Sequence, residues 1–323
     1  MINLQQISEQ LIGTSVDGIP GVIHIDSGKE GPELGITACT HGNEPTGLAV
    51  FGYLLKELNL QEKLLRGSVY LVVNNLEATQ KFFEAKTEKQ KSEARYVEVN
   101  MNRLPEDFAQ DESSTKSEVV RAQELLPIWK RFTHALDIHS THVPTQPMLI
   151  SRKHNFESIQ KLIVGFPIEV LVTNIDVQQI GTPAFASYGE SQNTPVFAIE
   201  AGQHTSTEAF ECAQVCVTNL LQNLDMITGE TKQTNTKLEE YEVCDSVMFP
   251  TIDFDFVTNF HSYDVVTTGQ VLAQDANGKQ ITSPLDGHLL LPTQKRGHEK
   301  DISEEVAFLT KPVKVRAVIP NVN

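Results

Sequence analysis

The stretch that decides the fold of this chain runs Ile36-Thr37-Ala38-Cys39-Thr40-His41-Gly42-Asn43-Glu44-Pro45. Its first residues are small or β-branched and predict a short buried strand. A Gly-Asn turn follows, and then Pro45, which suits the first position of a helix because the N–H that proline lacks has no helical partner there. The stretch therefore predicts a strand that turns into a helix, a corner at which α/β proteins place ligand and catalytic groups.

Two chemically active side chains lie three positions apart in this corner, on His41 and Glu44. Imidazole nitrogen and carboxylate oxygen both suit a divalent metal such as zinc. The alternative is a polar turn in which both side chains are merely solvated. This pair alone does not decide between the two interpretations.

The sequence on either side completes a strand-helix-strand unit. Strands are expected at residues 21–26 and 34–40, and apolar residues between 48 and 58 recur at helical spacing. Residues 68–74 form a near-continuous apolar strand of the kind that is buried on both faces. This order predicts an α/β fold with a mixed, largely parallel sheet flanked by helices. Further strands are expected at 135–140, 148–151, 169–172 and 196–200, helices at 119–132 and 206–227, and an exposed loop at 86–93.

The last of these helices is expected to begin where Thr205 and Glu208 stand at capping-box spacing. After it, the pattern of apolar and polar residues changes. Residues 228–240 contain almost no apolar side chains and predict a linker. Beyond them the pattern alternates as in β-strands, and Asn277-Gly278 predicts a two-residue hairpin. We therefore expect two domains, an α/β domain at 1–227 and a smaller β-rich domain at 238–323.

Composition limits the partners. The 323 residues include 26 Lys and Arg against 42 Asp and Glu, a formal net charge of −16, which argues against nucleic acid and anionic membranes. No apolar run approaches the roughly 18 residues of a membrane span, and the first residues lack the features of a signal peptide. The four cysteines form no C-x-x-C motif, so a cytoplasmic location is expected. A homo-oligomer is compatible with the sequence.

Further candidate site residues stand at strand ends or in loops. His139 ends the strand at 135–140, Glu200 ends the strand at 196–200, and Arg95 and the pair Asn102-Arg103 lie between the two halves of the domain. A catalytic zinc site has three protein ligands, and an additional Glu can take a proton from water and deliver it to a leaving amine. Arginine can bind a carboxylate or stabilise an oxyanion.

In chain order the motifs are His41-Gly42-Asn43-Glu44, Arg95, Asn102-Arg103, Asp137-Ile138-His139 and Ile199-Glu200-Ala201-Gly202. In order and spacing they resemble the succinylglutamate desuccinylase/aspartoacylase family, a branch of the zinc carboxypeptidase superfamily. The resemblance covers most of the chain, and residues 270–275 also resemble the desuccinylase pattern. It implies the zinc carboxypeptidase-like α/β fold.

The resemblance also implies roles, residue by residue. One zinc ion per chain would be bound by His41, Glu44 and His139. Glu200 would act as general base and then acid. Arg95 would polarise the scissile carbonyl. The α-carboxylate of the substrate's amino-acid half would be held by Asn102 and Arg103.

One departure from the family pattern is Asn100, where the family usually has an aspartate that orients a zinc-bound imidazole. An asparagine can still accept the imidazole N–H, but without a charge. Asp137 lies two residues before His139 and so on the same strand face. It either compensates for the lost charge or caps amides at the end of its strand.

A second departure is Glu190, ten residues before Glu200, where the resemblance implies an arginine that grips the distal carboxylate of a succinyl or aspartyl group. Two facing carboxylates repel each other. We therefore expect Glu190 to disfavour N-succinylglutamate and N-acetylaspartate, and to favour an amide whose far end is neutral or cationic. The alternative is a difference in loop length that leaves Glu190 on the surface.

The predicted function is that of a zinc-dependent amidohydrolase acting on carbon-nitrogen bonds other than ordinary peptide bonds. Its partner would be a small N-acyl amino acid, which it would split into a carboxylate and a free amino acid. The alternatives are a carboxypeptidase acting on short peptides and a catalytically silent binding protein of the same fold. Cys39 beside the motif is expected to be a small buried residue without a nucleophilic role.

Overall fold

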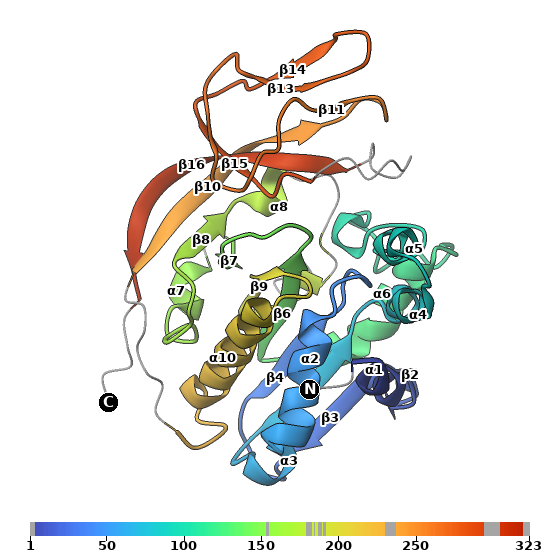
Figure 1. The fold of residues 1–323 in the computed structure, drawn as a ribbon. Helices are drawn as coiled ribbons and strands as arrows, with labels where there is room; N and C mark the ends of the chain where they lie inside the picture. Colours follow the sequence, from blue (N-terminus) through green and yellow to red (C-terminus); the bar gives the residue numbers. More distant parts are fainter. Residues whose placement is uncertain are drawn as a thin grey trace.

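A mixed sheet of eleven strands runs through the part of the chain that the computed structural model describes, which is residues 4–152, 155–178, 183, 185–186, 189, 192–229, 237–293 and 304–318 (Figure 1). In spatial order its strands are β12 (Val265–Val266), β15 (Gly287–Leu290), β16 (Glu305–Ala317), β10 (Lys237–Met248), β8 (Val170–Thr173), β7 (Met148–Ile150), β9 (Val196–Gln203), β6 (His134–Thr141), β4 (Glu33–Ala38), β5 (Ser68–Val73) and β3 (Val22–Asp26). Two small sheets hold β1 (Ser15–Val16) with β2 (Ile19–Pro20), and β11 (Asp255–Phe256) with β13 (Val271–Gln274) and β14 (Gln280–Thr282).

Helices cover both faces of the sheet in the N-terminal part of the chain (Figure 1). They are α1 (Leu4–Ile12), α2 (Thr46–Gly52), the π-helix η1 (Tyr53–Glu57), α3 (Leu60–Lys63), α4 (Leu76–Glu84), α5 (Glu88–Glu93), the 3-10 helix η2 (Met101–Arg103), α6 (Ser117–Trp129), α7 (Phe156–Ile159), α8 (Ile175–Gln178) and α10 (Thr207–Asn223). No helix among the described residues combines the length and apolar character needed to cross a bilayer.

Strand β5 shows why the sequence pattern worked for the sheet. All six of its residues are buried. Leu71 packs in the core under α2 and α10, whereas its neighbours Tyr70 and Val72 pack in the second core, under α6. A strand covered on both faces has no polar side, which is the near-continuous apolar pattern that the sequence shows.

Strand directions agree with the predicted class. β5, β4, β6 and β9 are parallel neighbours, and β3 is antiparallel to β5 at the edge. β7 is antiparallel to β9 and parallel to β8. The prediction of a mixed, largely parallel sheet flanked by helices is confirmed for the N-terminal part.

The parallel strands bring their carboxyl ends to one edge of the sheet. Thr37 of β4 lies beside Asp137 of β6, and His139 of β6 lies beside Glu200 of β9. The loop after β4 therefore emerges next to the ends of β6 and β9. This shared edge carries the candidate site.

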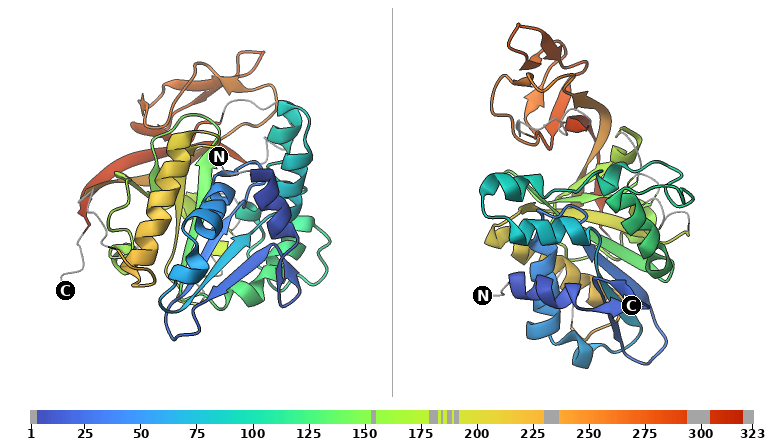
Figure 2. Two further views of the ribbon diagram at one scale, coloured as in Figure 1. Left: turned by 60° about the horizontal axis from the view of Figure 1, so that its bottom comes forward. Right: turned by 90° about the vertical axis from the view of Figure 1, so that its right-hand side faces the viewer.

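The sheet continues into the C-terminal part of the chain. β10 pairs in parallel with β8 and antiparallel with the long strand β16, and β15 and β12 extend this side. The small sheet of β11, β13 and β14 stands away from the N-terminal helices (Figure 2). The division into domains at 1–227 and 238–323 stays a prediction. The last residues of the linker expected at 228–240 belong to a strand instead, because β10 already begins at Lys237.

Three local predictions were wrong. Residues 86–93 are not a loop: Thr87 and Gln90 form a capping box for the short helix α5. The N-cap of α10 is Ser206, whose side chain accepts from the Ala209 N–H, and not Thr205. The hairpin loop around Asn277-Gly278 spans residues 275–279, because the Asp275 carboxylate accepts from two backbone N–H groups of the loop and widens it.

Candidate active site

The loop after β4 owes its path to two backbone features. Cys39 has a φ of +55°, a left-handed conformation that turns the chain out of the strand. Gly42 then donates its N–H to the Arg95 carbonyl over 2.9 Å. A Cβ on Gly42 would lie 2.3 Å from the carbonyl carbon of Ala78 and 2.5 Å from the Ala94 oxygen, so only glycine fits. The loop is thereby fixed against the segment that carries Arg95.

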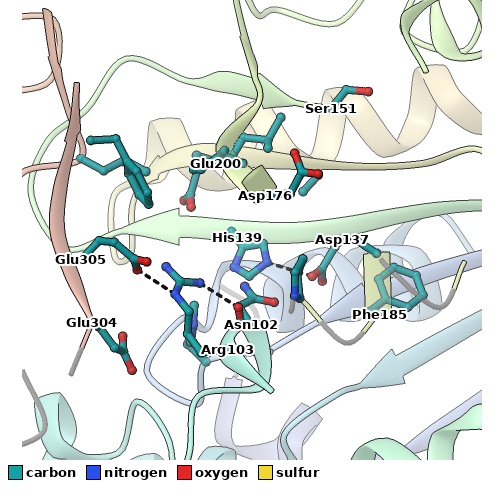
Figure 3. Close-up of a pocket in the computed structure, with 18 of the residues that line it drawn as sticks. Asn102, Arg103, Asp137, His139, Ser151, Asp176, Phe185, Glu200, Glu304 and Glu305 are labelled. Carbon is teal, nitrogen blue, oxygen red and sulfur yellow. Dashed lines mark hydrogen bonds and ion pairs between the residues drawn. The ribbon is translucent and has the colours of Figure 1, made fainter. Parts of the chain in front are cut away.

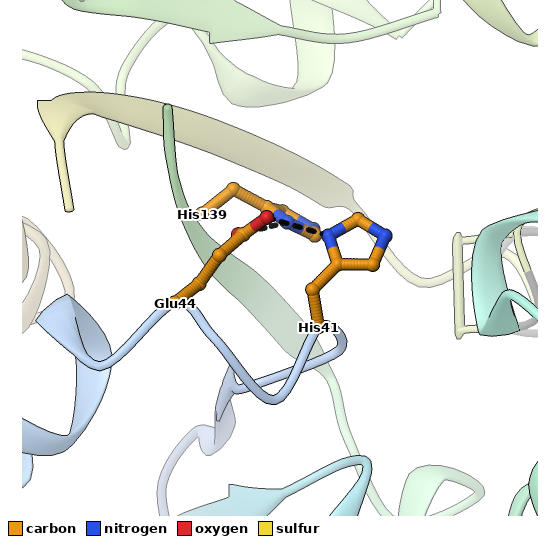
Figure 4. A group of neighbouring side chains, drawn as sticks. All are labelled: His41, Glu44 and His139. Atoms are coloured by element: carbon orange, nitrogen blue, oxygen red, sulfur yellow. Dashed lines mark hydrogen bonds and ion pairs between the residues drawn. The ribbon is translucent and has the colours of Figure 1, made fainter. Parts of the chain in front are cut away.

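The structure brings His41, Glu44 and His139 together in one buried cluster (Figure 4). The Nδ1 atom of His41 lies 2.6 Å from Glu44 Oε1, and the Nδ1 atom of His139 lies 3.0 Å from Glu44 Oε2. One ligand atom from each residue can be chosen so that all lie within 4.8 Å of one another. Two imidazole nitrogens and a carboxylate oxygen form a donor set that suits a divalent metal such as zinc.

Asp137 orients His139 from behind. Its Oδ2 lies 2.8 Å from His139 Nε2, and the hydroxyls of Thr37 and Thr40 donate to the same carboxylate over 2.7 Å and 3.0 Å. If Asp137 compensates for the charge that Asn100 lacks, it must contact His139 in this way. The contact leaves His139 Nδ1 directed at Glu44.

Asn100 occupies the equivalent place behind His41. Its Oδ1 lies 3.1 Å from His41 Nε2 and also accepts the backbone N–H of Asn102 over 2.9 Å. Its Nδ2 donates to Glu304 Oε2 over 2.9 Å. The carboxamide therefore links the candidate metal ligand His41 to a carboxylate from the C-terminal part of the chain.

The pKa values of the cluster follow from burial and mutual contact. Burial, helped by Arg95, lowers the pKa of His41 to about 4 despite the nearby Glu44. Burial would raise the pKa of Glu44, but His41 and His139 outweigh it and lower that pKa well below its usual range. Burial likewise fails to lower the pKa of His139, because Asp137 and Glu44 raise it well above its usual value. Glu44 is thus an ionised carboxylate, as a metal ligand must be.

Glu200 and Arg95 stand beside the cluster. Burial, followed by the charge of Glu44, raises the pKa of Glu200 to about 8, although His139 and Arg95 pull it down. The Oε2 atom of Glu200 is buried and has no hydrogen-bond partner among the described residues. Arg95 donates from Nη1 to Glu44 Oε1 over 3.1 Å. A carboxyl group that holds or releases a proton near neutral pH is thus placed next to a guanidinium.

Arg103, which the resemblance assigns to a carboxylate clamp with Asn102, already has partners within the protein. Arg103 donates from Nε to Glu305 Oε2 over 2.8 Å and from Nη1 to the Asn102 carbonyl over 2.8 Å. Both Asn102 and Arg103 line the same cleft as His41, His139 and Glu200. Glu190, predicted to face the acyl end of the substrate, lies outside the described residues.

The cleft has a volume of about 200 Å³ and two chemically different ends. Figure 3 shows Glu304, Glu305 and Arg103 on one side of His139 and Glu200, and Ser151 and Asp176 on the other. Apolar side chains also line it: Ile150, Ile175, Phe185, Val196, Phe197 and Phe308. The two ends suggest separate places for the two halves of a substrate.

Three glutamates of the site could not be found from the sequence. Glu305 is the first residue of β16 and Glu304 precedes it. Both lie about two hundred positions away in the sequence from their partners Arg103 and Asn100. Glu118 of α6 is completely buried and accepts the backbone N–H groups of Val97, Glu98 and Val99 over 2.5, 3.1 and 3.0 Å. In the sequence it is an ordinary acidic residue in the first turn of a helix, a pattern that carries no signal of this role.

Comparison with known proteins gives the same assignment. A family model for the succinylglutamate desuccinylase/aspartoacylase catalytic domain matches residues 30–224, more than half of the chain. A comparison with curated protein sequences gives no significant match.

Solved structures show the fold. A succinylglutamate desuccinylase/aspartoacylase from Rhodobacter sphaeroides is 18% identical, with a TM-score of 0.65 over 88% of this chain and 87% of the other. A succinylglutamate desuccinylase from Vibrio cholerae is 15% identical, with a TM-score of 0.67 over 91% and 86%. Murine aminoacylase 3 is 18% identical, with a TM-score of 0.62 over 90% and 98%. From the family model, supported by the shared fold, the chain belongs to the succinylglutamate desuccinylase/aspartoacylase family.

Proposed function

We propose that this protein is a zinc-dependent hydrolase that cleaves the amide bond of an N-acyl amino acid. The observation that carries the proposal is the buried His41–Glu44–His139 cluster with Glu200 beside it, whose pKa is raised to about 8. The names of the family and of its structural relatives, which include desuccinylases and an aminoacylase, support a deacylating reaction.

The cluster fits a zinc ion by the chemistry of its donors. Asp137 and Asn100 face the Nε2 atoms of the two histidines, so that both Nδ1 atoms are left for a metal. Contacts of this kind fix the ring orientation of metal-binding histidines. Zinc bound there would supply a Lewis acid for the amide carbonyl and lower the pKa of water.

Glu200 moves the proton in this proposal. A carboxylate at Glu200 accepts a proton from the attacking water, and the resulting carboxylic acid returns it to the leaving amine. The unpartnered Oε2 atom is the acceptor. Burial beside Glu44 raises the pKa of Glu200, which favours return of the proton to the leaving amine.

Arg95 stabilises the developing charge on the amide oxygen. Its Nη1 is held by Glu44, and no other N–H of its guanidinium bonds a described residue. These N–H groups can therefore donate to an oxyanion, an interaction that strengthens as the charge forms.

The lining of the cleft favours an uncharged acyl group. Beyond Glu200 the walls include Ile150, Ile175 and Phe185. Among the described residues, the cation on that side is Arg152, which pairs with Asp176; Nε and Oδ2 of the two side chains lie 2.9 Å apart. A succinyl or aspartyl carboxylate there would meet repulsion from Asp176, so we expect N-succinylglutamate to be a poor substrate. Glu190 would reinforce this preference if it faces the cleft.

The test is release of free amine from a panel of N-acyl amino acids and short peptides by the zinc-loaded protein. We expect neutral N-acyl amino acids to be cleaved with a kcat/KM at least tenfold above that for N-succinylglutamate. Cleavage of peptides in preference to every N-acyl amino acid would identify a carboxypeptidase instead. Zinc binding without any turnover would identify a silent binding protein.

A further inference from the structure

The end of the cleft that contains Arg103 is not a simple carboxylate clamp. Glu305 lies against Arg103, and the Glu305 side chain has no exposed surface, whereas 16% of the Arg103 side chain is exposed. Because water does not reach the Glu305 carboxylate, solvent cannot take the place of Arg103 as its partner. Glu305 therefore stays paired with Arg103 and neutralises much of the guanidinium charge. A substrate carboxylate can reach only what this pair leaves of the guanidinium.

The neighbouring residue adds a second negative charge. Glu304 lines the same cleft and accepts one hydrogen bond, at Oε2, from Asn100. Among the described residues nothing donates to its other oxygen. Although burial opposes it, the nearby Arg95 and Arg103 lower the pKa of Glu304, so the group is ionised at neutral pH.

Glu304 thus presents an ionised carboxylate to the place where the amino-acid half of the substrate would lie, and Glu305 reduces the positive charge of Arg103 beside it. A ligand that carried only a carboxylate there would be repelled by Glu304 and attracted only weakly by the neutralised Arg103. A ligand with a carboxylate and a cation can satisfy both sides, the first at Arg103 and the second at Glu304. Repulsion of the wrong charge is a common source of specificity in such sites.

We propose that the amino-acid half of the substrate carries a cationic side chain, an ammonium or guanidinium group, which is recognised by Glu304. This inference rests on the proposed hydrolase function and narrows its substrate class to N-acylated basic amino acids. Glu305 acts through Arg103, which it holds in place, and is a positioning residue.

The experiment compares two substrates of similar length, Nα-acetyllysine and Nα-acetylnorleucine, which differ by the terminal ammonium group. We expect the zinc-loaded protein to show a kcat/KM at least tenfold higher for the lysine compound, as one charge-assisted hydrogen bond would give. Binding of free lysine and free norleucine, measured by calorimetry, should differ in the same direction.

The Glu304→Gln variant separates recognition from structure. Its amide oxygen can still accept the Asn100 N–H, so the zinc content should not change, while the preference for lysine should fall to less than about threefold. A control, Glu106→Gln, removes an exposed glutamate away from the cleft and should keep the preference.

The outcomes distinguish the two proposals. Equal cleavage of both compounds by the wild type, or an unchanged lysine preference in Glu304→Gln, would overturn the inference and leave the hydrolase assignment intact. Absence of turnover with every N-acyl amino acid would overturn the proposed function. The calorimetric comparison of lysine with norleucine would then still decide whether the subsite selects a cation.

Discussion

Asn100 serves two partners that an aspartate could not serve together. Its oxygen faces His41 and its N–H faces the Glu304 carboxylate. An aspartate would keep the first contact and replace the second with a repulsion between two carboxylates. The asparagine and Glu304 together thus supply behind His41 what a single carboxylate supplies behind His139.

The first prediction concerns the hydrogen bond between Asn100 and Glu304. Asn100→Asp should destabilise the protein by roughly 1–3 kcal/mol, because the N–H donor to Glu304 is lost and a like charge takes its place. Adding Glu304→Gln should restore most of this loss, since the new glutamine can donate to Asp. Urea unfolding of both single variants and the double variant measures the coupling. Additive effects within about 0.3 kcal/mol would show that the two residues do not interact.

The second prediction separates chemistry from metal binding at Glu200. Glu200→Gln keeps the size of the side chain and removes its basicity, so kcat should fall by about 100-fold or more. The zinc content should stay at that of the wild type, because Glu200 is not part of the ligand cluster. Turnover close to wild type in this variant would rule out Glu200 as the proton carrier.

At the scale of elements, one residue of α6 fixes the segment between Arg95 and Asn102. The Glu118 carboxylate receives three consecutive backbone N–H groups and also the Asn75 side-chain N–H over 3.1 Å. In return, the Glu98 side chain accepts the Ser117 N–H at the start of the helix over 2.6 Å. The helix and the segment therefore hold each other.

The third prediction follows from this arrangement. In Glu118→Gln an NH2 group would face N–H donors, so stability should fall by roughly 1.5–3 kcal/mol. The value of kcat/KM should fall as well, since Arg95 and Asn102 lose their support. Thermal unfolding and steady-state kinetics test this, with the exposed Glu112→Gln as the control. Unchanged stability in Glu118→Gln would contradict the assigned role.

The fourth prediction concerns the pair that joins β10 to β16. The carboxylate of Glu240 is buried and receives Arg316 Nε over 2.6 Å and Nη2 over 3.0 Å. Burial opposes it, but Arg316 lowers the pKa of Glu240 below its usual value. The stabilisation from a depressed carboxyl pKa is therefore complete above the unfolded pKa of about 4.3 and is lost as the pH falls through the folded value.

Arg316→Met should accordingly cost roughly 3–5 kcal/mol at pH 7, because it leaves Glu240 buried without its partner. The cost should shrink as the pH falls below the unfolded pKa of about 4.3, because protonation of Glu240 removes the charge that Arg316 compensates. Denaturant unfolding of the wild type and the variant at several pH values measures this. A cost that does not change with pH would show that the pair contributes no charge-dependent stability.

These elements also show what the sequence could predict. The strands around β5 and the loop at His41 follow local patterns, so their positions and directions were predictable. A strand at 305–309 was also expected from the sequence and is the inner half of β16. Its continuation to Ala317 was not expected, because the side chains beyond Thr310 are mostly exposed and the extension depends on pairing with the distant strand β10. The same holds for Glu304 and Glu305, whose importance lies in contacts with residues far away in the sequence.

One predicted effect changes for this reason. From the role that the resemblance assigns to Arg103, its loss is expected to act mainly on KM. In the structure Arg103 is the partner of the fully buried Glu305, so its removal also leaves a buried carboxylate unpaired. Site residues near Arg103 thus contribute to both stability and recognition.

At the scale of the whole molecule, the two parts of the chain share one sheet and one cleft. A cluster of apolar side chains spans the junction between β8 and β10: Met148, Val170, Val172, Val243, Leu290 and Phe308. The C-terminal part also supplies Glu304 and Glu305, which line the cleft beside Arg103. The expected cytoplasmic location and homo-oligomer remain predictions from the sequence.

The net charge of −16 does not decide the preference of the site, because recognition depends on the few charges that face the cleft. At the end that contains Arg103, the charges of Arg95 and Arg103 are balanced by Glu44, Glu304 and Glu305. An acidic protein and a cation-selective site agree here, but only the local contacts carry the argument.

The central claim is that His41, Glu44 and His139 hold one catalytic zinc ion. The most direct test is a titration of chelator-treated protein with zinc, in which bound metal is measured by mass spectrometry and free-amine release is measured in the same samples. We predict that activity rises in proportion to bound zinc and stops rising at one ion per chain, and that folded His139→Ala neither binds the ion nor gains activity. Full activity of the metal-free wild type, or one tightly bound zinc ion in His139→Ala, would contradict the account.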